Sequence, residues 1–140
     1  MTLQRSLVLV KPDGVSRRLT GEILRRIETK GYRIVALQQR TADDDLLAQH
    51  YAEHVGKPFY APLVEFMGSG ELVALVVEGH RAIEGIRTLI GATDPTAAAP
   101  GSIRGDLAAD TGEKVQRNLV HASDSPESAE REIGLWFPAS

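Results

Sequence analysis

The alternation of apolar runs with amphipathic segments predicts an α+β fold. Four short apolar runs have the composition of buried β-strands, and the segments between them mostly carry apolar residues at helical spacing. The second strand ends near a chain reversal, not at the start of a parallel crossover. Together these observations favour an antiparallel sheet covered by helices, in a chain of 140 residues.

The first strand, helix and second strand follow one another within the first 40 residues. Residues 6–11 form a continuous apolar run that leaves Lys11 at its C-terminal end, and residues 12–14 stop it with a turn signal. A helix with an apolar stripe begins at Thr20 and ends at Gly31. Residues 32–40 are predicted to form the second strand.

The middle of the chain contains two helical pieces, a strand and a further helix. Acidic residues at 43–45 suit the N-terminus of a helix that carries His50, Tyr51 and His54. After a break, a second helical piece follows Phe59. The remaining elements are a buried strand at 72–77, a helix at 81–90 and a long irregular region from Gly91 to about Gln116.

The last strand and helix lie within residues 118–138. Leu119 and Val120 form a short strand that is predicted to carry His121 at its C-terminal end. Ser125 and Pro126 then begin a helix, as a cap and a first-turn proline. The free N–H groups and the dipole of a helix N-terminus favour an anion beside this histidine.

This order of elements fits a ferredoxin-like sandwich, with an antiparallel four-stranded sheet (β-α-β-β-α-β), added helices and one long loop. A doubly wound parallel sheet is the competing topology. We expect one domain over residues 1–140.

Composition excludes several classes of function. The absence of cysteine excludes disulfides, thiolate–metal sites and cysteine nucleophiles. No apolar run reaches the ~18 residues of a membrane span, and no signal segment precedes the first strand, so we expect a cytoplasmic location and no membrane partner. A net charge of −3 argues against specific nucleic-acid binding.

Phosphate binding, if it occurs, must rely on side chains, because the chain has neither a P-loop nor a dinucleotide-binding motif. Lys11, Arg87 and Arg104 occupy distinctive places: a strand end, a helix and the glycine-rich loop. Each alone fits a solvated cation. Together with Thr93 they fit a clamp for a polyphosphate, whose charge needs fixed cations and donors.

The histidines differ in their settings. His50 and His54 are four residues apart on one helix, a spacing that zinc sites use, although no glutamate or cysteine completes such a site. His121 is followed along the next helix by Glu132, whose carboxylate is placed to hold one ring nitrogen and leave the other free as a nucleophile. Spacing alone fits an ordinary turn histidine equally well.

Three sequence blocks resemble the nucleoside diphosphate kinase family, and the resemblance extends from Leu7 to Pro138. The first is Lys-Pro-Asp-Gly-Val at 11–15, and the second is Pro-Gly-Ser-Ile-Arg-Gly-Asp at 100–106. The third is Asn-Leu-Val-His-Ala-Ser-Asp-Ser at 118–125, followed by Glu-Arg-Glu-Ile-Gly-Leu-Trp-Phe at 130–137.

This resemblance implies a ferredoxin-like fold and transfer of a γ-phosphate from a nucleoside triphosphate to a nucleoside diphosphate. The family reaction is a ping-pong cycle through a phosphohistidine, with broad tolerance of base and sugar. Mg²⁺ is carried mainly by the nucleotide phosphates, and Asp124 is a further candidate ligand. The resemblance also implies a homo-oligomer, for which we favour a hexamer over a tetramer or dimer.

Residue roles follow from the same resemblance. His121 matches the nucleophile, Glu132 the residue that orients it, and Ser123 the neighbouring hydroxyl. The residues that match the nucleotide site are Lys11, Tyr51, Phe59, Arg87, Thr93, Arg104 and Asn118. In the family, the counterpart of Phe59 stacks on the base; those of Lys11, which we also count as catalytic, and Asn118 contact the sugar; and the two arginines and the threonine hold phosphates.

Two features depart from the family pattern. Ala122 follows the histidine where glycine is usual, which is costly only if this position needs a positive φ. Residues 107–117 form a segment a few residues longer than expected. The alternative function is therefore a nucleotide-binding or regulatory protein on the same fold, with weakened or lost transfer activity.

Overall fold

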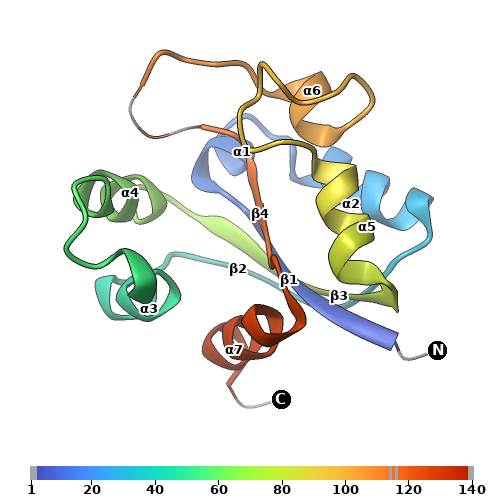
Figure 1. Ribbon diagram of the computed structural model, residues 1–140, viewed down its shortest axis with the longest axis horizontal. Coiled ribbons are helices and arrows are strands. Elements are labelled where there is room, and N and C mark those ends of the chain that lie inside the picture. The colour runs from blue at the N-terminus through green and yellow to red at the C-terminus, as the bar shows by residue number, and fades with distance from the viewer. Residues whose placement is uncertain (1–2, 114, 116, 139–140) are drawn as a thin grey trace.

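Four strands form one sheet with helices on both faces in the computed structural model, which describes residues 3–113, 115 and 117–138 (Figure 1). Of the helices described, none combines the length and apolar character that a membrane span needs. In chain order the elements are β1 (Leu3–Val10), α1 (Pro12–Ser16), α2 (Thr20–Lys30), β2 (Arg33–Arg40), α3 (Asp44–His50), a 3₁₀ turn η1 (Ala52–His54), α4 (Tyr60–Met67), β3 (Leu72–His80), α5 (Ala82–Ile90), α6 (Ile103–Leu107), β4 (Val120–Ala122) and α7 (Pro126–Trp136).

The sheet is antiparallel throughout, in the order β2-β3-β1-β4. This arrangement confirms the predicted α+β class and the ferredoxin-like order of strands, and the competing parallel topology is wrong. Because β1 and β2 both pair with β3, the helix between them, α2, crosses over one face of the sheet. The second crossover helix, α5, connects β3 to β4 in the same way (Figure 1).

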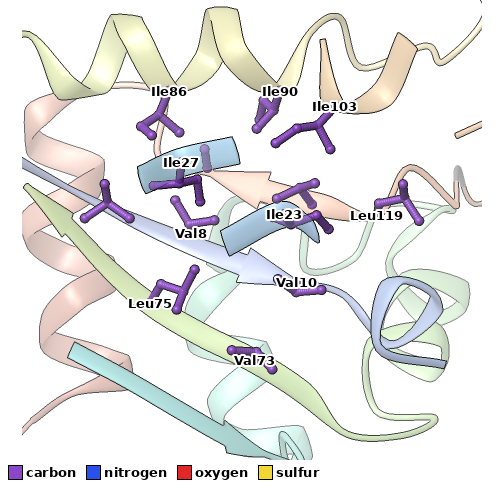
Figure 2. Packing of buried hydrophobic residues seen from close by; sticks show 13 residues of the cluster. Val8, Val10, Ile23, Ile27, Val73, Leu75, Ile86, Ile90, Ile103 and Leu119 are labelled. Atoms are coloured by element: carbon purple, nitrogen blue, oxygen red, sulfur yellow. The ribbon is translucent and has the colours of Figure 1, made fainter. Parts of the chain in front are cut away.

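Side-chain alternation along the strands divides the core into two layers. One layer packs against α2 and α5, and its members include Val8 and Val10 of β1 with Ile23, Ile27, Ile86 and Ile90 of the helices (Figure 2). The opposite layer contains Leu7 and Leu9 with residues of α3, α4 and α7. Each face of β1 is therefore covered, as its continuous apolar sequence predicts.

The helix boundaries follow the predicted signals closely. Gly31 ends α2 with φ +113°, a left-handed conformation that glycine adopts without a Cβ clash. At the start of α7, the Ser125 side chain accepts a hydrogen bond from the Ser128 N–H, and Pro126 occupies the first turn. The capping chemistry thus fixes the C-terminal end of α2 and the N-terminal end of α7, as the sequence predicts.

Several predicted bounds are wrong: α3 ends at His50 and does not carry His54, β3 extends to His80, and the predicted turn at 12–14 lies in α1. Two further differences lie closer to His121. The region from Gly91 onward is not irregular throughout, because Ser102 caps the short helix α6 by accepting from the Gly105 N–H. The last strand also begins later than predicted. Leu119 has φ +73° and lies outside β4, which pairs with β1 from Val120 onward. His121 is consequently the middle residue of a strand, not its end.

The described part of segment 107–117 packs against the body of the protein. Val115 contacts the core layer beneath α3, α4 and α7. The Arg117 guanidinium lies 4.9 Å above the Phe66 ring of α4, a cation–π distance. Residues 114 and 116 of this segment lie outside the described part of the chain. Through Val115 and Arg117, the described part of the segment therefore packs against the core layer and α4.

Candidate active site

The register of β4 determines which face of the sheet His121 occupies. His121 pairs directly with Leu9 of β1. Opposite residues of an antiparallel pair point to the same face, and Leu9 belongs to the layer covered by α3, α4 and α7. The imidazole is therefore directed toward α7 and the end of α3, while its neighbours Val120 and Ala122 enter the other core layer.

A carboxylate on α7 holds one nitrogen of the imidazole. His121 Nε2 lies 3.0 Å from Glu132 Oε1, which confirms the predicted contact. Ser123 Oγ donates to the same carboxylate oxygen at 2.8 Å, and it accepts from the Leu7 N–H of β1 at 3.0 Å. Glu132 and Ser123 are buried, whereas the His121 side chain retains 20% exposure. The ring is thus fixed by buried groups and open on one side.

The charge state of Glu132 selects the histidine tautomer. Burial raises the pKa of this carboxyl, but hydrogen bonding and charge interaction with His121, with smaller effects of His50 and Ser123, outweigh it and lower the pKa below its usual value. An ionised carboxylate can only accept hydrogen bonds. The nitrogen that faces it, Nε2, must therefore be the donor and carry the ring proton. Nδ1 takes part in no hydrogen bond among the described residues and keeps a free lone pair.

A second histidine packs behind the first, which sequence spacing did not reveal. The His50 ring lies 4.7 Å from the His121 ring, centre to centre, in an edge-to-face arrangement. Its Nδ1 accepts from Trp136 Nε1 at 3.1 Å. Burial, followed by the nearby charge of His121, lowers the pKa of His50 to about 3. His50 is therefore neutral near pH 7, with its proton on Nε2.

His50, His121 and Glu132 together resemble a metal cluster, since their candidate ligand atoms lie within 4.8 Å of one another. Part of their bonding capacity is already used, however, because Trp136 occupies Nδ1 of His50 and both His121 Nε2 and Ser123 bond to Glu132. Two imidazoles and one buried carboxylate also differ from the oxygen ligands that Mg²⁺ prefers. The cluster is suited to orienting a nucleophile.

A second polar group surrounds the ends of β1 and β4. Lys11 Nζ donates to Asn118 Oδ1 at 2.8 Å, and Asn118 Nδ2 donates to the Thr93 carbonyl at 2.8 Å. Burial, reinforced by the charge of Arg104 and opposed by that of Asp13, lowers the pKa of Lys11 to about 8. The structure therefore brings together three predicted residues that lie far apart in the sequence.

The two predicted arginines have different surroundings. Arg104 is buried, and it donates through Nε to the Asn118 carbonyl, through one terminal nitrogen to Gly91 and through the other to Val120. Burial, then repulsion from Arg87, lowers the pKa of Arg104 to about 10. Arg87 is exposed and donates to the Ala122 carbonyl at 3.1 Å. Both arginines are thus anchored to the strand that carries His121.

The aromatic candidates lie at the rim of this region. The Tyr51 ring contacts His50 at 4.6 Å, and burial raises the pKa of its hydroxyl. Phe59 is 46% exposed, with its ring 5.0 Å from that of His54. An exposed ring face of this kind is available for stacking on a base. His54 is thus an aromatic neighbour of Phe59 and does not share a site with His50.

Asp124 follows β4 and is exposed. It lines a hollow of about 710 Å³ together with Arg87 and Thr88 of α5. A solvent-facing carboxylate is the type of ligand that a hydrated Mg²⁺ ion accepts. Asp124 therefore fits the predicted role better than the buried Glu132 does.

Ala122 does not disturb the histidine strand. It is absent from the residues with positive φ, and it pairs with Val8 within β4. Its side chain is 2% exposed and enters the core layer under α2 and α5. An ordinary strand conformation needs no glycine, so this departure from the family pattern leaves the loop geometry unchanged.

Known proteins resemble this chain along nearly its whole length. The family model of nucleoside diphosphate kinase matches residues 4–140. A nucleoside diphosphate kinase of Streptomyces avermitilis is 66% identical over 136 residues, which cover 96% of each chain. A nucleoside diphosphate kinase of Mycobacterium tuberculosis is 60% identical over 138 residues, which cover 98% of each chain.

Solved structures agree with these sequence similarities. The structure of a halophilic nucleoside diphosphate kinase from Halobacterium salinarum in complex with CDP matches with a TM-score of 0.90 and 47% identity, over 97% of this chain and 88% of that one. A nucleoside diphosphate kinase family protein from Babesia bovis matches with a TM-score of 0.90 and 44% identity, over 96% and 88%. The family indicated by the motifs is confirmed, and the chain belongs to the nucleoside diphosphate kinases, which are phosphotransferases.

Proposed function

We propose that His121 carries the phosphoryl group in the nucleoside diphosphate kinase reaction of this protein. The observation that supports this role is the contact between His121 Nε2 and the buried Glu132 carboxylate, at 3.0 Å. It holds the ring in one tautomer and leaves Nδ1 as the nucleophile. Ser123 keeps the carboxylate in position by donating to it at 2.8 Å.

The reaction then proceeds in two transfers. In the first, the Nδ1 lone pair attacks the γ-phosphorus of a nucleoside triphosphate, and the bond to the β–γ bridging oxygen breaks to release a nucleoside diphosphate. In the second, a terminal phosphate oxygen of another nucleoside diphosphate attacks the phosphohistidine, and the P–N bond breaks. The attack needs no separate base, because an imidazole that carries its proton on Nε2 already presents a free lone pair at Nδ1.

Two kinds of charge need stabilisation during transfer: positive charge on the imidazole and negative charge on the phosphate oxygens. Bond formation at Nδ1 makes the ring cationic, and the Glu132 carboxylate stabilises that charge. We assign Arg87, Arg104 and Thr93 to the phosphates, because phosphoryl transfer depends on fixed cations and donors around the equatorial oxygens. Arg104 uses three of its N–H groups on backbone carbonyls, and a guanidinium has five.

The remainder of the nucleotide is assigned to residues that flank β1, α3, α4 and β4. Lys11 and Asn118, joined at 2.8 Å, are proposed to contact the sugar hydroxyl. The exposed ring of Phe59 is proposed to stack on the base, with Tyr51 nearby. Stacking without contacts to base edges would explain acceptance of any base. Mg²⁺ bound to the phosphates would neutralise part of their charge, with Asp124 as the available carboxylate.

Assembly is assigned by resemblance. We propose a homo-oligomer, with a hexamer preferred over a tetramer or dimer. β2 is an edge strand of the sheet, and Leu37 on it is 51% exposed. An open edge of this kind has unpaired backbone groups that a second copy can use. Cytoplasmic location also remains a prediction.

Labelling with ATP tests the proposed carrier. The protein is incubated with Mg²⁺ and γ-labelled ATP, freed of nucleotide and digested. We expect an acid-labile label on the peptide that contains His121, and its complete transfer to added GDP. α-Labelled ATP is the matched control and should leave no label, because only the γ-phosphoryl group is retained. A native protein that takes up no label, or a label that GDP does not remove, contradicts the proposal.

The pKa of Lys11 predicts how nucleotide use depends on pH. Since that pKa is lowered to about 8, the cation is present below pH 8 and is lost as the pH rises through this value. We therefore expect kcat/KM for a nucleoside diphosphate to fall by up to about tenfold per pH unit above 8. Assays between pH 7.5 and 9.5 avoid most of the phosphate titration, for which reference values lie near ~6.

Lys11→Met provides the comparison for this profile. It removes the titrating group, so kcat/KM should be low throughout this pH range and should not fall further near pH 8. If kcat/KM of the native protein stays constant up to pH 9.5, Lys11 does not bind the nucleotide as a cation.

A further inference from the structure

One buried carboxylate near the site belongs to the first of the three motifs, but the resemblance assigns it no role. Asp13 lies in α1 with 8% exposure. Its Oδ2 accepts from the Leu119 N–H at 3.1 Å. Its other oxygen, Oδ1, is also buried and has no hydrogen-bond partner among the described residues. A buried, half-satisfied carboxylate is costly, so its retention calls for a reason.

The residue that Asp13 holds has a strained backbone. Leu119 has φ +73°, and the Val120 N–H donates back to the Asn118 carbonyl at 2.8 Å. A positive φ enclosed by a bond between residues two apart defines a γ-turn, which is rare because a side chain crowds its own backbone. Such a turn persists only where surrounding contacts hold it in place.

The contacts that hold this turn come from the end of β1 and from α1. The Lys11 N–H donates to the Leu119 carbonyl at 2.8 Å, and Asp13 takes the Leu119 N–H. Both backbone polar groups of Leu119 are thereby satisfied. Gly14 allows α1 to approach this closely, because a Cβ there would lie 2.8 Å from Val10 Cγ1 and 3.2 Å from the Leu119 carbonyl oxygen.

The γ-turn at Leu119 also positions residues of the proposed nucleotide site. Asn118, on its first position, bonds to Lys11 Nζ and to the Thr93 carbonyl. The carbonyls on either side of Leu119, those of Asn118 and Val120, both accept from Arg104. Any relaxation of Leu119 toward a negative φ would rotate these peptide groups and displace the side chains of Asn118, Lys11 and Arg104.

We propose that Asp13 is a positioning residue for phosphoryl transfer: by accepting the Leu119 N–H, it holds the turn that aligns Asn118, Lys11 and Arg104 with the sugar and phosphates. The inference rests on the proposed nucleotide site. The side chain of Asp13 bonds to the Leu119 backbone, so it would act through the turn, and its negative charge also lies close enough to Lys11 and Arg104 to favour their charged forms.

Two substitutions separate the acceptor from the charge. Asp13→Ala removes the acceptor, and we expect KM for nucleoside diphosphates to rise about tenfold, with a smaller change in kcat, as the loss of one aligning hydrogen bond implies. Asp13→Asn keeps an acceptor for the Leu119 N–H and gives the buried second position a neutral group. Its KM should stay within about threefold of the native value, since no aligning bond is lost.

Asp43→Ala is the matched control. Asp43 also accepts from a backbone N–H, that of Leu46 at 2.8 Å, but it caps the N-terminus of α3. Its replacement should lower the melting temperature and leave KM unchanged. This control distinguishes a loss of stability from a loss of alignment.

The outcomes decide the proposal even if Asp13→Ala does not fold. Folded Asp13→Ala with native KM makes Asp13 merely structural and overturns the proposal. Asp13→Asn with a native melting temperature but a tenfold higher KM overturns it as well, because the acceptor is then not what matters. Failure of the proposed function is separate: it would appear as a native protein that transfers no phosphate, before any variant is compared.

Discussion

Replacing His121 by asparagine is expected to lower kcat by about a thousandfold or more, the scale seen when a covalent nucleophile is removed. The buried Glu132, whose side chain is 7% exposed, keeps the Ser123 hydroxyl as a donor, although the shorter asparagine does not reach the position of Nε2. The asparagine amide has no basic lone pair to attack phosphorus. The change therefore removes the reacting atom and retains most of the surrounding network. A coupled assay of GDP phosphorylation by ATP measures the loss.

His80→Asn is the matched control for this substitution. His80 is exposed, ends β3 and pairs with Leu3 at the far end of β1 from Lys11. Its replacement should leave kcat unchanged. If His121→Asn retains more than about a tenth of native kcat, well above what loss of a nucleophile allows, the phosphoryl group does not pass through His121. Nucleotide protection against heat, measured in parallel, should persist in the variant, because the clamp residues are intact.

The fold was accessible from sequence because local signals and the core agree. Residues 6–10 read as a doubly buried strand, and β1 is covered on both faces. Gly31 and Ser125 mark helix ends by backbone chemistry that acts within a few residues. Leu119 was wrongly predicted to lie in a strand, because its side chain is apolar. Asp13, 106 positions away, holds its backbone out of the strand, and no local signal reports that contact.

The site shows a similar division. Motifs supplied the identities of the residues around His121, and spacing suggested the partner Glu132. The tautomers and pKa values of the site residues, however, depend on contacts between segments that lie far apart in the sequence. Trp136, 86 positions from His50, fixes the tautomer of that buried histidine, and no helical spacing reports such a bond. Composition cannot report burial either, although burial is the main cause of the lowered pKa of Lys11.

Arg104 illustrates how a residue predicted to bind phosphate also supports the fold. The residue is 5% exposed, and its guanidinium donates to the carbonyls of Gly91, Asn118 and Val120. Replacing it by methionine keeps much of the side-chain volume but leaves the carbonyls of Gly91 and Val120 without this donor, whereas the Asn118 carbonyl keeps the Val120 N–H. Each unsatisfied buried group costs ~1–3 kcal/mol, partly offset by the lost desolvation of the charge. We expect the free energy of unfolding to fall by about 3 kcal/mol, together with a large loss of kcat/KM.

Urea unfolding at fixed protein concentration measures this effect, since any oligomer would make stability depend on concentration. Arg25→Met is the control. Arg25 is also paired, with Glu22 at 2.8 Å, but its side chain is 61% exposed. A surface pair of this type contributes ~1 kcal/mol or less. A variant of Arg104 that loses activity but keeps native stability would show that its bonds to the backbone are dispensable and that its role is confined to the phosphates. The contrast between the two arginines follows from burial: the same guanidinium is replaceable where water can take over its partners, and it is not where the carbonyls of Gly91 and Val120 depend on it.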